Sequence, residues 1–303
     1  MKLKASNNTL PYIAIIIAMI LWSSSGIATK IALQGFSPLT LVVLRFTIAV
    51  LLMLIVGLAT GTLQKIERKH IPMFVLGGLF DPFIYYVCET YGLRLMNSPT
   101  VAEVLLSTCP IFAPILAYIL IREQVTWLNI IGIFISTCGV ILMIIIGNDN
   151  FAIGSPWGVV LCFAAVFATV LYTIILRQFP EKYSNLSIVF YSQLFGWMFF
   201  IPAWAIVDLP QMIHTPLVMS EIAIPISAVA YLAAFSSVLA FILFSYTIRK
   251  LGVTRANAFN NIRPVFTALL MLLLFGEQLP LSKWLAMLLV IIGLYICQLQ
   301  KKA

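Results

Sequence analysis

The chain has 303 residues, of which 62% are hydrophobic and only 9% are charged, and its mean hydropathy of +1.07 excludes a water-soluble globular protein. The formal net charge is +8, but no basic cluster with interleaved aromatic residues stands apart from the apolar runs, so nucleic acid is not an expected partner. The expected surroundings of the chain are therefore membrane lipid.

Ten apolar runs of about twenty residues, the length that crosses ~30 Å of hydrocarbon, follow one another along the chain. They lie near 11–32, 38–59, 71–92, 99–121, 126–147, 156–177, 186–207, 222–248, 254–275 and 280–299. The first run follows Lys2 and Lys4, but its length and the lack of a clear small-residue cleavage site distinguish it from a secretory signal peptide. All five cysteines fall within apolar runs, which predicts free thiols. The predicted fold class is an all-α integral membrane protein with ten transmembrane helices.

Lys and Arg residues are distributed unevenly over the segments between these runs. If the amino terminus is cytoplasmic, most of the 18 Lys and Arg residues lie in inner segments, and the outer segments hold only Lys30, Arg94 and Lys283. Segments rich in Lys and Arg remain on the cytoplasmic side of a membrane. We therefore expect a bacterial inner-membrane protein with both termini in the cytoplasm.

An internal repeat appears when the chain is shifted by 154 residues, which aligns 102–139 with 256–293. The matched pairs include Pro110 with Pro264, Phe112 with Phe266, Glu123 with Glu277, Gln124 with Gln278 and Gly139 with Gly293. The repeat unit holds five spans, an odd number, so the second copy must be inverted in the membrane. We expect two inverted five-helix repeats over residues 1–147 and 148–303, an architecture characteristic of secondary transporters.

Several positions in the two halves carry a resemblance to a known family. They are Pro110 with Glu123, Pro264 with Glu277, Trp22 followed by small residues and Lys30 in the first helix, and Arg45 in the second. On these positions nearly the whole chain resembles the drug/metabolite transporter superfamily, specifically its EamA-type branch. The resemblance implies a transporter of amino acids, related metabolites or drugs, an exporter in most members and an importer in some. Asp81, Glu89 and Glu103 depart from the family pattern and argue against a purely apolar cavity.

Charged side chains within the spans are the first candidates for function. They are Arg45, Asp81, Glu89, Glu103 and Arg263. A charge at mid-membrane costs about 2.5–3.5 kcal/mol on insertion scales, so such residues persist mainly where they face a cavity, a partner or a function. We expect these five residues to supply charge recognition or ion coupling.

Polar residues also form stripes on the fourth and ninth helices. The stripes consist of Glu103, Ser107 and Pro110 in the fourth helix and of Asn257, Asn260, Asn261 and Pro264 in the ninth. Helical spacing places each set on one face, and the repeat relates the two faces to each other. They therefore predict opposite walls of a central substrate pathway, although the amides alternatively only form hydrogen bonds between helices.

The third helix contains Asp81 followed by Pro82, a pair suited to capping and restarting a helix within the membrane. Such a break often marks a transporter site; the alternative is a proline kink with Asp81 paired to Arg45 or Arg263. Asp81, Tyr85 and Glu89 are spaced by four residues and share a face, which suits a proton relay, unless Glu89 is an ordinary residue at a wet helix end.

Aromatic and hydroxyl residues of the first and sixth helices are further candidates to line the cavity. They are Trp22, Ser25, Gly26 and Thr29 in the first helix, and Thr169, Tyr172 and Thr173 in the sixth. Such groups hold an amphiphilic substrate or merely pack. Small residues at Gly132, Ser136 and Gly139 predict a close helix contact within the chain or in a homodimer.

Together these features predict alternating access of a central site, with export of an amino acid or a related small metabolite coupled to protonation of Glu103, Asp81 or both. Passive facilitation or import remains an alternative, and so does a non-transport membrane scaffold or sensor. The chain has no Walker A pattern and no clustered nucleophile, base or metal ligands. We therefore expect no enzyme activity, no cofactor and no metal.

Overall fold

The computed structural model describes residues 9–96, 104–146, 155–210, 219–276 and 279–299. Every regular element in these ranges is a helix, which confirms the all-α class. The first half contains α1 (Leu10–Ala32), α2 (Pro38–Ala59), η1 (Arg68–His70), α3 (Ile71–Gly78), η2 (Leu79–Ile84), α4 (Tyr85–Leu95), α6 (Cys109–Ile121) and α7 (Trp127–Ile145). The second half contains α8 (Pro156–Gln178), α9 (Asn185–Val207), α11 (Met219–Tyr231), η3 (Leu232–Leu239), α12 (Ala240–Leu251), α13 (Val253–Ala258), η4 (Phe259–Ile262), α14 (Arg263–Phe275) and α15 (Leu281–Gln298).

Ten spans make up the bundle. Nine helices within the described ranges are long and apolar enough to cross a membrane, and the tenth span runs from α13 to α14 with the 3-10 segment η4 between them. Large aliphatic side chains cover the outside of the bundle; Ile55, Ile206 and Leu273, for example, are 63%, 76% and 77% exposed. Acyl chains solvate such a surface, whereas water does not.

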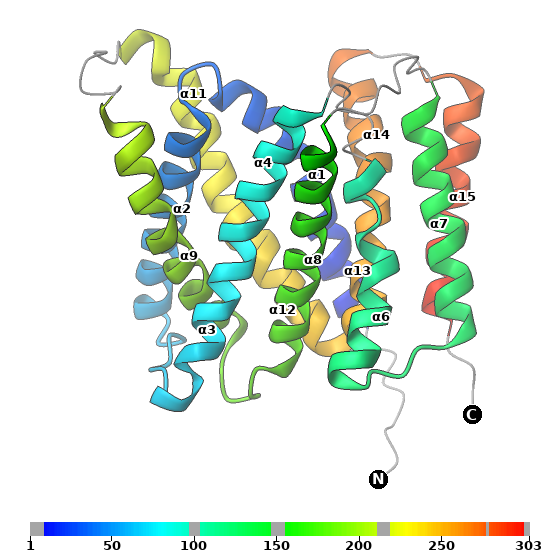
Figure 1. Cartoon of the computed structure of the whole chain (residues 1–303), viewed down its shortest axis with the longest axis horizontal. Helices are drawn as coiled ribbons and strands as arrows, with labels where there is room; N and C mark the ends of the chain where they lie inside the picture. Colours follow the sequence, from blue (N-terminus) through cyan, green and yellow to red (C-terminus); the bar gives the residue numbers. More distant parts are fainter. Residues whose placement is uncertain (1–8, 97–103, 147–154, 211–218, 277–278, 300–303) are drawn as a thin grey trace.

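The helix boundaries repeat along the chain. α6 begins at Cys109 and α14 at Arg263, while α7 begins at Trp127 and α15 at Leu281, so both pairs are 154 residues apart, the spacing expected from the sequence. α1 and α8 begin at opposite faces of the bundle, as an inverted repeat requires, and α15 ends at the face where α1 begins (Figure 1).

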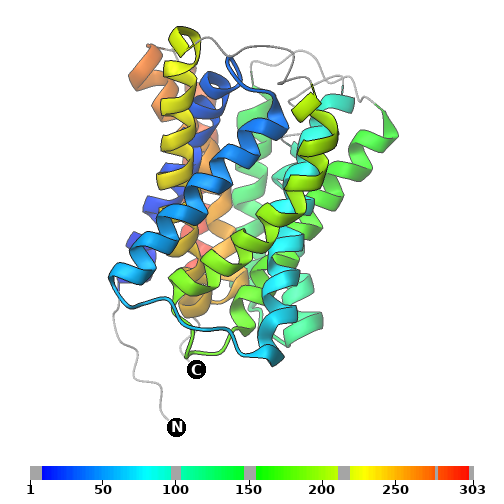
Figure 2. The same ribbon diagram turned by 90° about the vertical axis from the view of Figure 1, so that its left-hand side faces the viewer.

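The two halves interlock at the centre of the bundle. α1 packs against α12 and α14 of the second half, and α8 packs in the corresponding way against α4 and α6 of the first. Figure 2 shows α2 and α9, which contact each other, both tilted strongly from the long direction of the bundle. The central parts of α1, α2, α8 and α9 therefore lie where the two halves of the chain meet.

Two spans are interrupted by π-helical segments, η2 and η3, a rare kind of helix that often lies at functional sites. In η2 the backbone of Asp81 is extended (φ −142°, ψ 113°) and is followed by Pro82, so the helix breaks where the sequence indicated. η3 interrupts the eighth span. η2 packs against α9, and η3 packs against α2.

Candidate functional site

Arg45, on α2, lies at the centre of the bundle and is only 4% exposed. Its Nε donates to Ser237 Oγ (2.6 Å) and its Nη2 donates to Ser236 Oγ (2.9 Å), both on η3. The guanidinium carbon lies 5.4 Å from the ring centre of Tyr86. Within the described part of the chain Arg45 makes no ion pair, so hydroxyl groups and aromatic faces surround this buried cation.

Asp81, on η2, is also buried, with 6% of its surface exposed. Its Oδ2 accepts a hydrogen bond from Thr169 Oγ1 on α8 (3.3 Å), while Oδ1 has no hydrogen-bond partner among the described residues. Arg45 and Glu89 are both within electrostatic range of this carboxyl group. Asp81 forms no ion pair with Arg45 or Arg263, the alternative that the sequence left open, within the described ranges.

Tyr85 and Glu89 continue the polar face that begins at Asp81. The hydroxyl of Tyr85 donates to Glu89 Oε1 (2.9 Å), so the spacing of four residues does bring these two side chains together. Arg263, at the start of α14, is within electrostatic range of Tyr85. Tyr85 therefore lies within electrostatic range of Glu89 of its own half and of Arg263 of the second half.

Trp22, on α1, closes one side of this centre. Its Nε1 donates to the carbonyl oxygen of Ser236 (3.1 Å), a group that the π-helical segment η3 leaves accessible. The indole ring packs edge-on against Phe241 and Phe244, with ring centres 5.2 and 4.9 Å apart. Arg263 lies over the other part of the indole, 5.8 Å from its centre.

Tyr172 and Gln193 add two more buried polar groups from the second half. Tyr172 is 1% exposed, and its hydroxyl has no hydrogen-bond partner among the described residues. Gln193 donates through Nε2 to the carbonyl oxygen of Ser237 (2.6 Å), while its Oε1 is left without a partner in the same ranges. Such buried, incompletely bonded groups are costly, and they are common where a ligand completes the bonding.

Two asparagines of the ninth span, Asn257 and Asn261, make hydrogen bonds to other helices, and Asn260 bonds to Asn257 within the span. Asn257 Nδ2 donates to Thr173 Oγ1 (3.1 Å), Asn260 donates to Asn257 Oδ1 (3.3 Å), and Asn261 Nδ2 donates to Ser136 Oγ (2.8 Å). Whether these residues also line a pathway remains a prediction. Ser107 lies in a turn immediately before α6, and Glu103 falls outside the described residues.

We define the polar centre as Trp22, Arg45, Asp81, Tyr85, Glu89, Tyr172, Gln193, Ser236, Ser237 and Arg263. Gln193, Ser236 and Ser237 were not among the residues predicted from the sequence. Two adjacent serines and a glutamine within apolar runs are a signal of polar function in the membrane. The serines bond to Arg45 of the other half, however, and Gln193 bonds to Ser237 on a different helix of its own half, so neither contact follows from local spacing. Among the described residues, no group of three or more His, Cys, Asp or Glu side chains is placed to hold a metal ion.

Comparison with known proteins identifies relatives of this chain. Uncharacterized transporter YetK of Bacillus subtilis is 27% identical over 96% of this chain and 87% of its own length. A probable terminal-alkyne amino-acid exporter of Streptantibioticus cattleyicolor is 24% identical over 88% of this chain and 86% of its own. An S-adenosylmethionine/S-adenosylhomocysteine transporter of Chlamydia trachomatis is 23% identical over 86% and 80%, respectively.

The fold also matches a solved crystal structure of 19% sequence identity, with a TM-score of 0.75 over 95% of this chain and 97% of the other. The model of the EamA-like transporter family matches twice, over residues 9–145 and 156–298, so it covers the two halves separately. The chain therefore belongs to the EamA-like transporter family.

Proposed function

We propose that this membrane transporter exports a small zwitterionic metabolite, an amino acid or a derivative of one, through the polar centre. The observation that carries the proposal is the presence of two opposite charges, not paired with each other, in one buried region: the guanidinium of Arg45 and the incompletely bonded carboxyl of Asp81. A carboxylate of the substrate would bind the guanidinium, and its ammonium group would bind Asp81 or Glu89. Trp22 and Tyr85 would contact the side chain of the substrate.

Two relatives support this class of substrate. One is named as an amino-acid exporter and the other as a transporter of S-adenosylmethionine and S-adenosylhomocysteine. All of these molecules contain both an amino and a carboxylate group. The opposite charges of the polar centre are complementary to the amino and carboxylate groups that these molecules share. The aromatic residues would contact the remaining part of each substrate.

Alternating access is the proposed mechanism. Residues of the polar centre come from α1, α2, η2 and α4 in the first half and from α8, α9, η3 and α14 in the second. Rocking of one half against the other would expose the site first to one side of the membrane and then to the other. We place both termini in the cytoplasm of a bacterial inner membrane, so export runs from the face where the chain begins.

We further propose that protonation of Asp81, Glu103 or both is coupled to substrate binding. A carboxyl group with one oxygen free of partners can take up a proton as the ammonium group of the substrate leaves. Asp81→Asn and Glu103→Gln keep the size of the side chain but remove the carboxyl group that can gain and lose a proton. If both variants retained full, still proton-dependent transport, this coupling mechanism would be wrong.

The first experiment compares metabolites in cells that lack or overproduce the protein, and then measures movement of the best candidate in proteoliposomes with and without an imposed pH gradient. Gradient-driven accumulation of one amino acid supports the proposal. Equilibration without accumulation would indicate a passive facilitator, and movement of no solute would favour a scaffold or sensor.

A further inference from the structure

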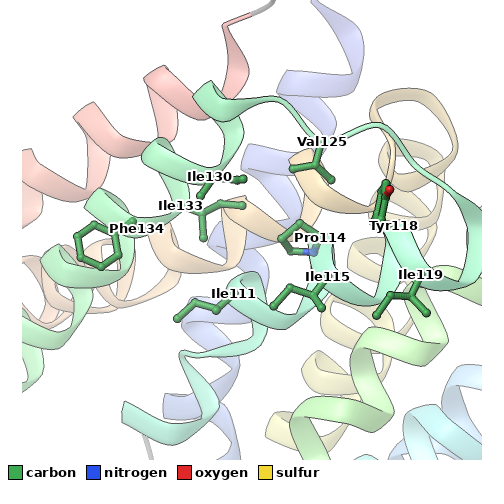
Figure 3. A pocket seen from close by; sticks show the side chains of 9 residues that line it. All are labelled: Ile111, Pro114, Ile115, Tyr118, Ile119, Val125, Ile130, Ile133 and Phe134. Atoms are coloured by element: carbon green, nitrogen blue, oxygen red, sulfur yellow. The ribbon is translucent and has the colours of Figure 1, made fainter.

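A groove of about 520 Å³ lies between α6 and α7, away from the polar centre. Its lining is apolar apart from one tyrosine hydroxyl: Ile111, Pro114, Ile115, Tyr118, Ile119, Val125, Ile130, Ile133 and Phe134 (Figure 3). Tyr118 and Ile119 are each 64% exposed, so the groove opens on the outer surface of the bundle, where lipid surrounds the protein. Its volume falls in the range of about 300–1,000 Å³ that is typical of pockets for small molecules.

Arg122 lies in the segment that joins α6 to α7, between two residues that line the groove, Tyr118 and Val125. Its backbone is left-handed (φ 52°), and it is the one residue other than glycine with positive φ in the described ranges. The repeat places Gly276 (φ 67°) at the corresponding position after α14, where glycine adopts this conformation without steric cost. The first half therefore keeps a cation at a position that favours glycine.

The side chain of Arg122 is exposed and makes neither a hydrogen bond nor an ion pair with the part of the chain that the structure describes. The neighbouring carboxylate of Glu123 bonds elsewhere: it accepts hydrogen bonds from the backbone N–H groups of Val253 and Thr254, both at 2.8 Å. Trp127, the first residue of the next helix α7, is 78% exposed. An exposed arginine and tryptophan at one end of an apolar surface are typical of the level of the lipid headgroups.

We propose that this groove binds an acyl chain of an anionic phospholipid whose phosphate group contacts Arg122. An apolar groove next to an arginine that has no ion-pair partner among the described residues is complementary to that lipid in both shape and charge. The positively charged loops predict that this end faces the cytoplasm, where anionic lipids are attracted to basic groups near the membrane. The corresponding position of the second half, with Gly276, offers no cation, so the site belongs to one leaflet only.

The test measures lipid retained by the full-length protein, by native mass spectrometry, from mixed vesicles of phosphatidylglycerol and phosphatidylcholine. We expect wild-type protein to prefer phosphatidylglycerol by roughly fivefold, the effect of one cation near an anionic headgroup. Arg122→Gly should lose the preference and still fold, because glycine suits the left-handed backbone. Lys65→Gly is the matched control, since it removes an exposed cation from the same face but far from the groove, and it should keep the preference.

A second variant tests the groove itself. Ile115→Trp fills it from α6 and should reduce retention of both lipids, whereas Arg122→Gly should affect only the anionic one. The proposal is overturned if the wild type shows no preference, if Arg122→Gly keeps it, or if Ile115→Trp instead dissociates a dimer without changing lipid retention.

Discussion

A buried arginine surrounded by hydroxyl groups is costly unless another charge compensates it. Arg45 is such a residue, because its described hydrogen-bond partners are the neutral side chains of Ser236 and Ser237. A planar guanidinium can donate to these serines through some of its N–H groups and keep others for a carboxylate. The proposed substrate supplies that carboxylate during each transport cycle.

Replacing Arg45 by Gln therefore tests recognition separately from folding. We expect transport of an amino acid to fall by at least about tenfold, the loss of a hydrogen bond between charged groups. The unfolding temperature in detergent should not fall in parallel, because the variant also removes a buried, uncompensated charge. Arg45→Lys, which retains the charge without the planar fork, should be intermediate in transport, and equal transport by all three proteins would contradict the assigned role.

Asn261 is expected to behave in the opposite way. Its amide donates to Ser136 Oγ and Thr137 Oγ1 on α7, at 2.8 and 3.1 Å, and so joins the ninth span to the fifth. Asn261→Leu should lower the free energy of unfolding by about 0.5–1.5 kcal/mol, while the affinity for substrate stays unchanged. A large change in affinity without loss of stability would instead place Asn261 in the substrate pathway.

Residue-level prediction from the sequence succeeded where the relevant spacing was local. The contact between Tyr85 and Glu89 follows from a separation of four residues on one helix. The partners of Arg45 do not follow from local spacing, because Ser236 and Ser237 are far away in the chain and reach it only through the packing of η3 against α2. The buried charged residues could therefore be predicted from the sequence more readily than the residues that contact them.

At the scale of helices, α7 and α15 pack so closely that two of their glycines have no room for a side chain. A Cβ atom added at Gly132 would lie 2.3 Å from the backbone nitrogen of Cys297, and one added at Gly293 would lie 2.3 Å from that of Ser136. The small residues of α7 thus form a contact within the chain, one of the two alternatives that the sequence left open.

Substitution of either glycine should separate these helices. We expect Gly132→Ala and Gly293→Ala to lower the free energy of unfolding by at least about 1–3 kcal/mol, as overpacked cores do. Gly26→Ala is the matched control, because it lies within α1 and an added Cβ has nothing within 4 Å. The control should be neutral or slightly stabilising, and the comparison is made by thermal unfolding in one detergent.

The two helix breaks differ in how far the sequence indicates them. Asp81 followed by Pro82 is a recognisable signal, and the backbone does leave the helical conformation there. Its counterpart η3 contains neither proline nor glycine within Leu232–Leu239, so local propensity does not mark it. Only the tertiary environment, in which the serines of η3 bond to Arg45, accounts for the second irregular segment.

Glu67 connects the segment between α2 and α3 to the segment between α8 and α9. Its hydrogen bonds with Lys182 and Lys69 hold the pKa of the carboxyl at about 2, below its ordinary value of 4.5. A carboxyl with a lowered pKa in the folded state stabilises the fold above its ordinary pKa and loses that contribution as the pH falls toward 2.

The difference in unfolding temperature between the wild type and Glu67→Gln should therefore be constant from about pH 8 to about pH 5 and should shrink at lower pH. High salt should reduce it as well, because the ion pair is exposed. Glu181→Gln, a loss of the same charge at a residue with no ion pair in the described ranges, serves as the control. A difference that grew on acidification would contradict the assigned interaction.

For the whole molecule, the sequence revealed the repeat only in part. The spacing of 154 residues holds for the last two helices of each half, but α1 and α8 begin 146 residues apart, at Leu10 and Pro156. The offset is 147 residues at the starts of α2 and α9 and 153 residues at the starts of η2 and η3, so a single shift of the chain cannot detect both parts. The apolar runs and the odd number of spans were nevertheless sufficient for the inverted architecture.

Movement of the halves is the property that alternating access requires, and contacts between the halves provide a way to block it. At the face where the chain begins, Glu67 of the first half pairs with Lys182 of the second. At the opposite end, the Oδ2 of Asp208 accepts hydrogen bonds from Ser37 and from the backbone nitrogen of Thr40. Each face is thus bridged by side chains from both halves.

Cysteine pairs at these bridges should stop transport once they are cross-linked. The variants are made in a background with the five native cysteines replaced. We expect the double variant Glu67→Cys with Lys182→Cys to lose transport on oxidation and to regain it on reduction. The double variant Ser37→Cys with Asp208→Cys should behave in the same way. Thr60→Cys with Thr62→Cys is the control, because these exposed hydroxyls lie 2.7 Å apart within one half. Because rocking separates the halves at one face at a time, either bridge alone should be sufficient to arrest the cycle. Full transport with both bridges cross-linked would show that the halves do not move as proposed.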